Sequence, residues 1–107
     1  GPPSPEAAQE LWVGFWSALA RGDLREAQEL THSSMRSGLS EFVGAEGQAL
    51  ARASLRCSIS MEPPVVSAGQ ARYGTRCFDD SGTVESKGGT MGLTREGDVW
   101  RVLCFGC

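Results

Sequence analysis

Cysteine is the residue type in this chain that most clearly points to specific chemistry. The 107 residues contain four of them, at Cys57, Cys77, Cys104 and Cys107. An even number in a small acidic domain is typical of two disulfides and an oxidising compartment, whereas unpaired cysteines pack as small buried hydrophobic side chains. Three pairings are open. A hairpin centred near Ser67 would place Cys57 opposite Cys77, and the other two would then pair within the tail if the last strand ends by Phe105.

The last two cysteines also form a Cys-x-x-Cys motif at residues 104–107. A redox-active motif needs its first cysteine at a helix N-terminus, which lowers the thiol pKa, and no helix follows here. A zinc site with four cysteines normally has two close pairs, but Cys57 and Cys77 are twenty residues apart. Disulfides are therefore favoured over redox or zinc chemistry, and we expect no metal and no cofactor.

His32 is the only histidine, and the only side chain whose ordinary pKa lies near neutrality. With an acidic partner it could serve a pocket enzyme as an acid or a base. Its neighbours Thr31, Ser33 and Ser34 are residues that cap helices. We therefore favour a ring nitrogen that bonds to the backbone between two helices.

Asp79 and Asp80 are adjacent carboxylates, which could hold a metal or act as an acid–base pair. Adjacent residues of a strand point to opposite faces, however, and Asp-Asp-Ser-Gly is typical of a hairpin turn. We predict a solvated turn at this position.

Large aromatic side chains are the last group that could bind a ligand. Trp12, Phe15 and Trp16 follow one face of the predicted first helix, and Tyr73 and Trp100 lie on predicted strands. Binding pockets for apolar ligands are lined by such residues. The same pattern is also typical of an ordinary core, which we favour, and the five residues remain the pocket candidates.

Composition excludes two classes of function. The net charge is −3 and the ten basic residues are scattered, whereas nucleic-acid binding needs clustered Lys and Arg. No apolar run approaches the roughly 18–20 residues of a membrane span. Gly1-Pro2 is typical of the remnant of a cleaved tag, so we expect residues 1–3 to be a disordered start, residues 4–107 to form one domain, and any membrane anchor to have lain upstream.

The first half of the chain predicts helices. Ser4-Pro5-Glu6 is a helix start, and the apolar face that follows ends at Gly22. Asp23 begins a second helix with the D-x-x-E pattern of a capping box. Met35, Leu39, Phe42 and Val43 have the spacing of a third helical face, and residues 45–53 predict a further helical turn or two.

After Ser54 the period changes to two, which predicts strands. The expected strands cover residues 55–61, ended by Pro63-Pro64, then 71–77, about 83–95 and 99–105. Gly88, Gly89 and Gly92 predict a bulge or a close approach of another backbone in the third strand. In the fourth, Trp100, Val102 and Cys104 are expected to face the core. The fold class is thus α+β, with two or three helices packed on a four-stranded antiparallel meander.

This order of elements resembles the NTF2-like superfamily, also described as SnoaL-like or cystatin-like α+β cones. The resemblance rests on LWVGFWSALARGDLREAQEL at residues 11–30 and GDVWRVL at residues 97–103. It implies a curved sheet around a conical pocket, and it is greatest to small bacterial extracytoplasmic members, often lipoproteins. One departure is expected: the family has strands between its second and third helices, and this sequence predicts none.

The resemblance also implies what to look for in the pocket. Ketosteroid isomerases of the superfamily need a tyrosine and a base aspartate, and the corresponding positions here are Phe15 and Leu39. We therefore expect no enzyme. We expect instead an extracytoplasmic binding module for a protein partner, with a toxin-neutralising or secretion role, or for an apolar small molecule. The alternatives are an isomerase-like pocket enzyme using His32, or an assembly domain of a longer protein, and a homodimer through the sheet is expected of the family.

Overall fold

The computed structural model describes residues 1–79, 81, 82 and 85–107, and in this part of the chain helices precede strands. Helices are α1 Pro5–Ala20, α2 Leu24–Glu29, the 3-10 helix η1 Ser33–Phe42 and α3 Ala45–Ser54. Strands are β1 Cys57–Ile59, β2 Val65–Ser67, β3 Gln70–Phe78, β4 Glu85–Glu96 and β5 Val99–Phe105. The α+β class is confirmed. None of the helices in the described ranges has the length and apolar character needed to cross a bilayer.

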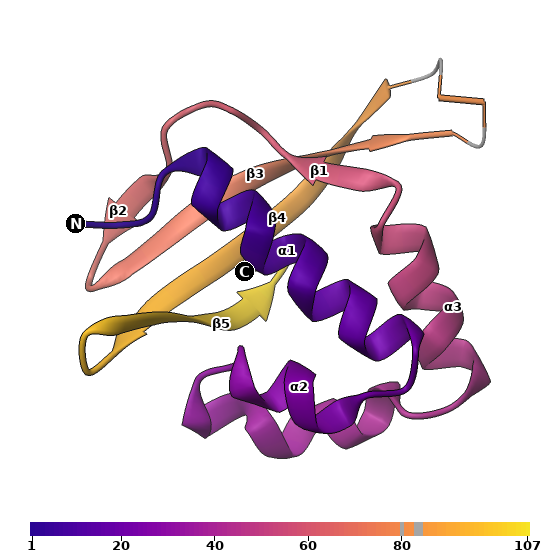
Figure 1. Cartoon of the computed structure of the whole chain (residues 1–107). Helices are drawn as coiled ribbons and strands as arrows, with labels where there is room; N and C mark the ends of the chain where they lie inside the picture. Colours follow the sequence, from indigo (N-terminus) through magenta and orange to yellow (C-terminus); the bar gives the residue numbers. More distant parts are fainter. Residues whose placement is uncertain (80, 83–84) are drawn as a thin grey trace.

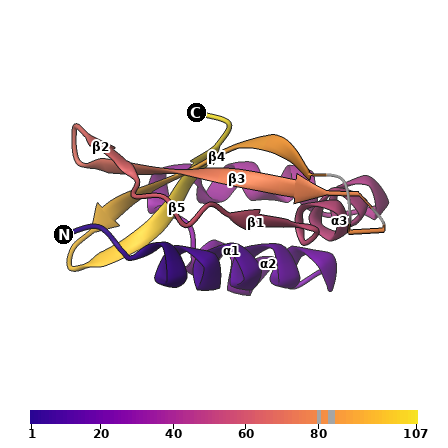
Figure 2. The same ribbon diagram turned by 90° about the horizontal axis from the view of Figure 1, so that it is seen from above.

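α1 lies against one face of a curled antiparallel sheet, and the other helices lie around its margins (Figures 1 and 2). α1 crosses the sheet, α3 lies beside α1 near the start of β1, and α2 with η1 lies beyond the edge formed by β5 (Figure 1). Most of the core is formed by the buried face of α1 and by side chains of β3, β4 and β5, and α2, η1, α3 and β1 each add one buried side chain.

α1 forms as its sequence predicts. The Ser4 hydroxyl accepts a hydrogen bond from the Ala7 N–H at 3.1 Å, and Pro5 occupies the first turn. Trp12, Phe15 and Trp16 recur on one face and are each at most 5% exposed. This helix therefore delivers most of the large aromatic side chains of the core.

α2 begins at the predicted cap, although only half of the capping box forms. The Asp23 carboxylate accepts from the Glu26 N–H at 3.0 Å. The Glu26 side chain pairs with Arg21 instead of returning to the Asp23 backbone. The helix is only six residues long, and the chain then meets β5 at a single parallel bridge between Thr31 and Val102.

The predicted α-helical face from Met35 to Val43 is wrong, because this segment is a 3-10 helix. A 3-10 helix has three residues per turn, so Leu39 and Phe42 fall on one side. Leu39 is buried and Phe42 packs partly against the core. Met35 and Val43, which the period of 3.6 would also have buried, are 44% and 58% exposed.

α3 is longer than the one or two turns predicted. It runs for ten residues and packs beside α1. Gly47 allows this packing against the end of η1, because a Cβ atom there would lie 2.1 Å from the Phe42 carbonyl oxygen. Leu55, which the strand pattern had placed in the sheet, instead caps α3 and is 37% exposed.

The first predicted strand is interrupted and shorter than expected. β1 covers only three residues, Met61 is 56% exposed, and the chain returns to β3 as β2 after Pro63-Pro64. β1 pairs in the register Cys57 with Cys77, as a hairpin centre near Ser67 predicts. β2 also pairs with β3, but its register differs by three residues from that of β1, and the three extra residues bulge out between β1 and β2. The sheet therefore has five strands, not the predicted four.

β4 and β5 contain the irregularities that the glycines predict. The register of β4 shifts opposite Gly74–Arg76 in β3 and again at Gly92/Leu93 opposite β5. The predicted start of this strand at Thr83 and Val84 lies outside the described residues, as does Asp80 of the predicted turn.

The second bulge corrects the predicted face of Cys104. Leu93 pairs with Val102, which is buried, but Gly92 pairs with Cys104, so Leu103 is the extra residue. A one-residue insertion moves every later side chain to the other face. Phe105 therefore joins the core in place of Cys104.

Candidate functional site

Aromatic rings fill the space between α1 and the sheet. The Phe105 ring centroid lies 5.6 Å from that of Trp12, 5.0 Å from Phe15 and 4.7 Å from Trp16. The Trp12 Nε1–H donates to the Ser54 carbonyl at 3.1 Å, whereas the buried Trp16 Nε1–H has no partner in the described part of the chain. These three pocket candidates are thus core residues in the structure, and so is a fourth, Tyr73.

An apolar pocket of about 310 Å³ remains between η1 and β5. Its apolar walls are Phe15, Met35, Leu39, Phe42, Val102, Leu103 and Phe105. Its other lining residues are Thr31, Gly38, Glu41 and Cys104. The Thr31 hydroxyl donates to the Ala27 carbonyl at 2.8 Å, so it is already engaged within the protein. Glu41 is the one charged residue among those that line the pocket.

Local backbone choices build this pocket. The 3-10 turn turns Leu39 and Phe42 toward β5, and the β5 bulge turns Phe105 toward α1. The sequence pattern put Leu39 and Phe42 on a helical face, and only the family resemblance placed Leu39, with Phe15, at a pocket. Phe105 was not predicted to be a ligand contact. The signals present were the three-residue spacing of Leu39 and Phe42 and the position of Gly92 opposite β5.

A larger hollow, of about 740 Å³, lies over β3 and β4. Four of its ten lining residues are glycines, and the others include Ser60, Glu62 and Arg76. Such a surface presents mainly backbone and small polar groups, while pockets that bury a ligand are mostly apolar. The smaller pocket beside β5 is therefore the better candidate site.

His32 lies outside both of these cavities and caps η1, as predicted. Its Nδ1 accepts from the Ser34 N–H at 3.2 Å, and its Nε2 lies 3.7 Å from a Glu96 carboxylate oxygen. Glu96 also accepts from the Ser33 N–H at 3.0 Å and pairs with Arg36 at 3.0 Å.

These donors lower the pKa of Glu96 below its ordinary value. The hydrogen bonds from Ser33 are the main cause, and the charges of Arg36 and His32 add to it. The cluster ties η1 to the end of β4, and of its members only His32 was a candidate from the sequence. The missed residues, Glu96 and Arg36, are separated by 60 positions, and no spacing pattern links them.

Tyr73 and Trp100, the other aromatic candidates, hold the N-terminal segment. The buried Tyr73 hydroxyl donates to the Pro3 carbonyl at 2.6 Å, and burial raises the pKa of this phenol. The Trp100 Nε1–H donates to the Gly1 carbonyl at 3.1 Å. Neither side chain lines the apolar pocket. The origin of residues 1–3 in a tag stays a prediction.

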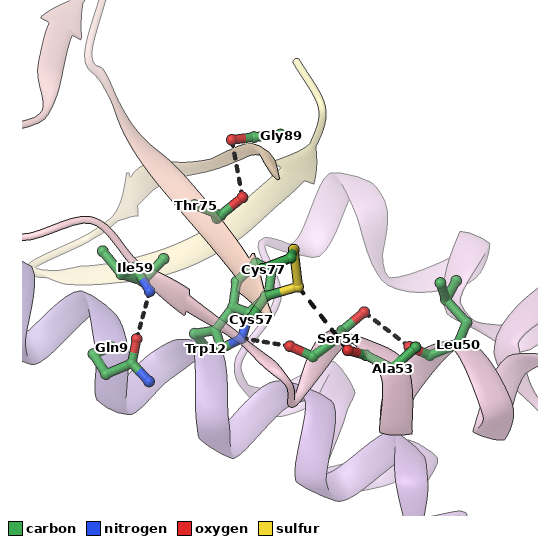
Figure 3. Close-up of a disulfide and its surroundings, with 10 residues drawn as sticks. All are labelled: Gln9, Trp12, Leu50, Ala53, Ser54, Cys57, Ile59, Thr75, Cys77 and Gly89. Carbon is green, nitrogen blue, oxygen red and sulfur yellow. Dashed lines mark hydrogen bonds between the residues drawn. A yellow bond between two sulfur atoms is a disulfide. The ribbon is translucent and has the colours of Figure 1, made fainter. Parts of the chain in front are cut away.

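Both predicted disulfides form, and all four cysteines are used. Cys57–Cys77 joins β1 to β3 beside the C-terminal end of α3, where Cys57 Sγ lies 4.0 Å from the Ala53 carbonyl oxygen (Figure 3). Cys104–Cys107 lies on β4 at Gly92, where a Cβ atom would meet both sulfurs at 2.7 and 2.8 Å. Among the described residues no three His, Cys, Asp or Glu side chains gather in a way that could hold a metal ion.

Comparison with known proteins identifies the fold. No family model matches the sequence, and no curated protein matches it. The chain is similar to a solved structure from Campylobacter jejuni, named provisionally as an NTF2-like transpeptidase. The identity is 13%, the TM-score is 0.53, and the match covers 92% of this chain and 95% of that one. This likeness confirms the NTF2-like fold and, at this identity, says nothing of activity or ligand.

Proposed function

We propose that this domain is a non-enzymatic binding module that takes an apolar group into the pocket between η1 and β5. The observation that carries the proposal is the pocket wall, where seven of eleven lining residues are apolar. A volume of about 310 Å³ lies at the lower end of the range of small-ligand pockets. It suits a small aromatic molecule or one large side chain.

The identity of two wall residues supports binding over catalysis. Phe15 and Leu39 stand where the isomerases of the resembled superfamily carry a tyrosine and a base aspartate, and both line this pocket. At these two positions the pocket has hydrocarbon side chains, whereas the isomerase reaction needs a hydroxyl and a carboxylate. His32, the residue of the enzymatic alternative, lies outside the pocket and is engaged with Ser34 and Glu96.

Binding of a neutral fluorescent probe, N-phenyl-1-naphthylamine, tests the proposal. Met35 lines the pocket and is 44% exposed, so Met35→Lys places a charge at the pocket mouth without burying it in the core. Val43→Lys is the matched control, because Val43 ends the same helix, is 58% exposed and does not line the pocket.

The wild type and Val43→Lys should bind the probe with equal affinity, whereas Met35→Lys should bind about ten-fold more weakly or worse, since an apolar site tolerates a charge poorly. Circular dichroism melting of each variant checks that both remain folded. Absence of saturable probe binding to the wild type, or equal binding by the two variants, would contradict the proposal.

We also propose an extracytoplasmic location, supported by the two disulfides. Expression of the chain in the bacterial cytoplasm and periplasm, followed by alkylation of free thiols and intact mass measurement, tests it. We expect folded protein with both bonds only from the periplasm. A stable, fully reduced cytoplasmic form with the same probe affinity would remove this support.

A further inference from the structure

β5 is an edge strand of the sheet. On its edge away from β4, called the open edge below, only Val102 is paired in the described part of the chain. The strand order ends β3-β4-β5. On the open edge, the Val102 N–H donates to the Leu30 carbonyl and the His32 N–H donates to the Val102 carbonyl, both at 2.8 Å. The chain then turns into η1. In the described part of the chain, no other segment pairs with this edge of β5.

The backbone of Phe105 repeats the arrangement of Val102. The Gly106 N–H donates to the Thr90 carbonyl at 2.8 Å and so faces β4. Peptide groups of successive strand residues point to opposite edges, and Phe105 is paired opposite Met91. The N–H and C=O of Phe105 therefore face the open edge, as those of Val102 do toward Leu30 and His32.

At the opposite edge of the sheet, formed by β1, the backbone hydrogen-bonds to a side chain of the domain itself. There the Ile59 N–H of β1 donates to the Gln9 side chain at 2.6 Å, so α1 satisfies this edge from within the domain (Figure 3). An unpaired edge beside an apolar pocket is the arrangement used for adding a peptide strand, because main-chain bonds hold the peptide and pockets take alternate side chains.

We propose that the occupant of the pocket is an extended peptide segment of a partner protein, paired in parallel with Phe105 as residues 30–32 pair with Val102. This inference rests on the proposed function, since it needs an apolar pocket. It continues a pairing surface that the chain itself already uses at Val102. One large apolar side chain of the peptide would enter between Leu39 and Phe42, which line the pocket from η1.

Charge adds a second requirement on the peptide. Glu41, which is exposed, is the one charged residue of the pocket wall. A Lys or Arg two positions from the apolar side chain would lie on the same side of the extended peptide and meet this carboxylate. The expected ligand is thus an apolar-x-basic segment in extended conformation.

The test uses the pentapeptide acetyl-Thr-Phe-Thr-Lys-Thr-amide and two backbone N-methylated forms, one methylated at residues 1, 3 and 5 and the other at residues 2 and 4. Displacement of N-phenyl-1-naphthylamine from the wild-type protein measures the affinity. In a bound strand only one of these two sets of N–H groups faces β5. One form should therefore bind about five-fold more weakly or worse, while the other stays within about two-fold of the parent peptide.

Glu41→Gln tests the charge requirement. It should weaken binding of the parent peptide by about two- to five-fold, with Glu46→Gln, an exposed change outside the pocket, as the control. Equal affinities of both methylated forms, or no displacement by any peptide, would overturn the inference. Probe binding that is sensitive to Met35→Lys but not to peptides would leave the proposed function standing. Dimerisation of the chain that displaces the probe would name a second copy as the occupant and also overturn it.

Discussion

Removing the disulfide between β1 and β3 should destabilise the domain more than removing the one at the C-terminus. Cys57–Cys77 closes a loop with a sequence separation of 20, and Cys104–Cys107 closes one of 3. In the chain-entropy model, the loss of entropy in the unfolded chain raises its free energy by about 3 kcal/mol for the first bond and about 2 kcal/mol for the second. The difference arises from loop length alone, so the order of the two effects is the prediction.

The experiment compares two double variants, Cys57→Ala with Cys77→Ala and Cys104→Ala with Cys107→Ala. Urea unfolding of each, without reductant, gives the free energy of unfolding, and thermal melting gives Tm. A loss of about 3 kcal/mol should lower Tm by roughly 12–24 °C in a domain of this size. Intact mass should rise by about 4 Da when the wild type is fully reduced, which establishes two bonds beforehand.

Two outcomes would refute this reasoning. Equal losses would show that loop closure is not the main contribution, and a greater loss for the C-terminal pair would show that its packing on Gly92 exceeds the entropic term. A wild type whose mass does not change on reduction would remove both the predicted stabilisation and the support for an extracytoplasmic location.

Three further predictions concern substitutions at single positions. Trp12→Phe should cost about 1–2 kcal/mol more than Trp16→Phe in urea unfolding, because both residues are buried but only Trp12 loses a hydrogen bond, to Ser54; equal losses would contradict this. Gly92→Ala should destabilise by about 1–3 kcal/mol, and most of that loss should vanish when Cys104 and Cys107 are alanine; Gly89→Ala, whose Cβ would meet nothing closer than 3.9 Å, is the control. The lowered pKa of Glu96 means that its stabilisation is present above the ordinary glutamate range and is lost as the pH falls through the folded pKa. Unfolding free energies measured against pH should therefore decline less steeply at acid pH in Glu96→Gln than in the wild type, and parallel curves would contradict the assignment.

Local signals predicted much of the fold. The cap at Ser4, the aromatic face of α1 and the Asp23 cap depend on neighbours within a few residues, and all three form. These three features need no long-range information. The pairing of Cys57 with Cys77 was also predicted, from a hairpin centre near Ser67. The turn itself lies at residues 68–69, and the residues that bulge between β1 and β2 bring Cys57 opposite Cys77.

The remaining features depend on tertiary contacts. The spacing from Met35 to Val43 fits an α-helix, and only packing of Leu39 and Phe42 against the domain distinguishes the 3-10 form. The bulge at Leu103 exchanges the faces of Cys104 and Phe105, and strict alternation cannot show it. The pocket follows from both of these irregularities, so its aromatic neighbours could be predicted from the sequence but most of its wall could not.

Titration of ¹⁵N-labelled protein with N-phenyl-1-naphthylamine, followed by ¹H–¹⁵N correlation spectra, tests the central claim most directly. We predict saturable shifts that are largest at the amides of Met35, Leu39 and Phe42 in η1 and of Leu103 and Phe105 in β5. Shifts concentrated instead around His32 and Glu96, or over the glycine-lined hollow of β3 and β4, would contradict the claim that the apolar pocket is the binding site.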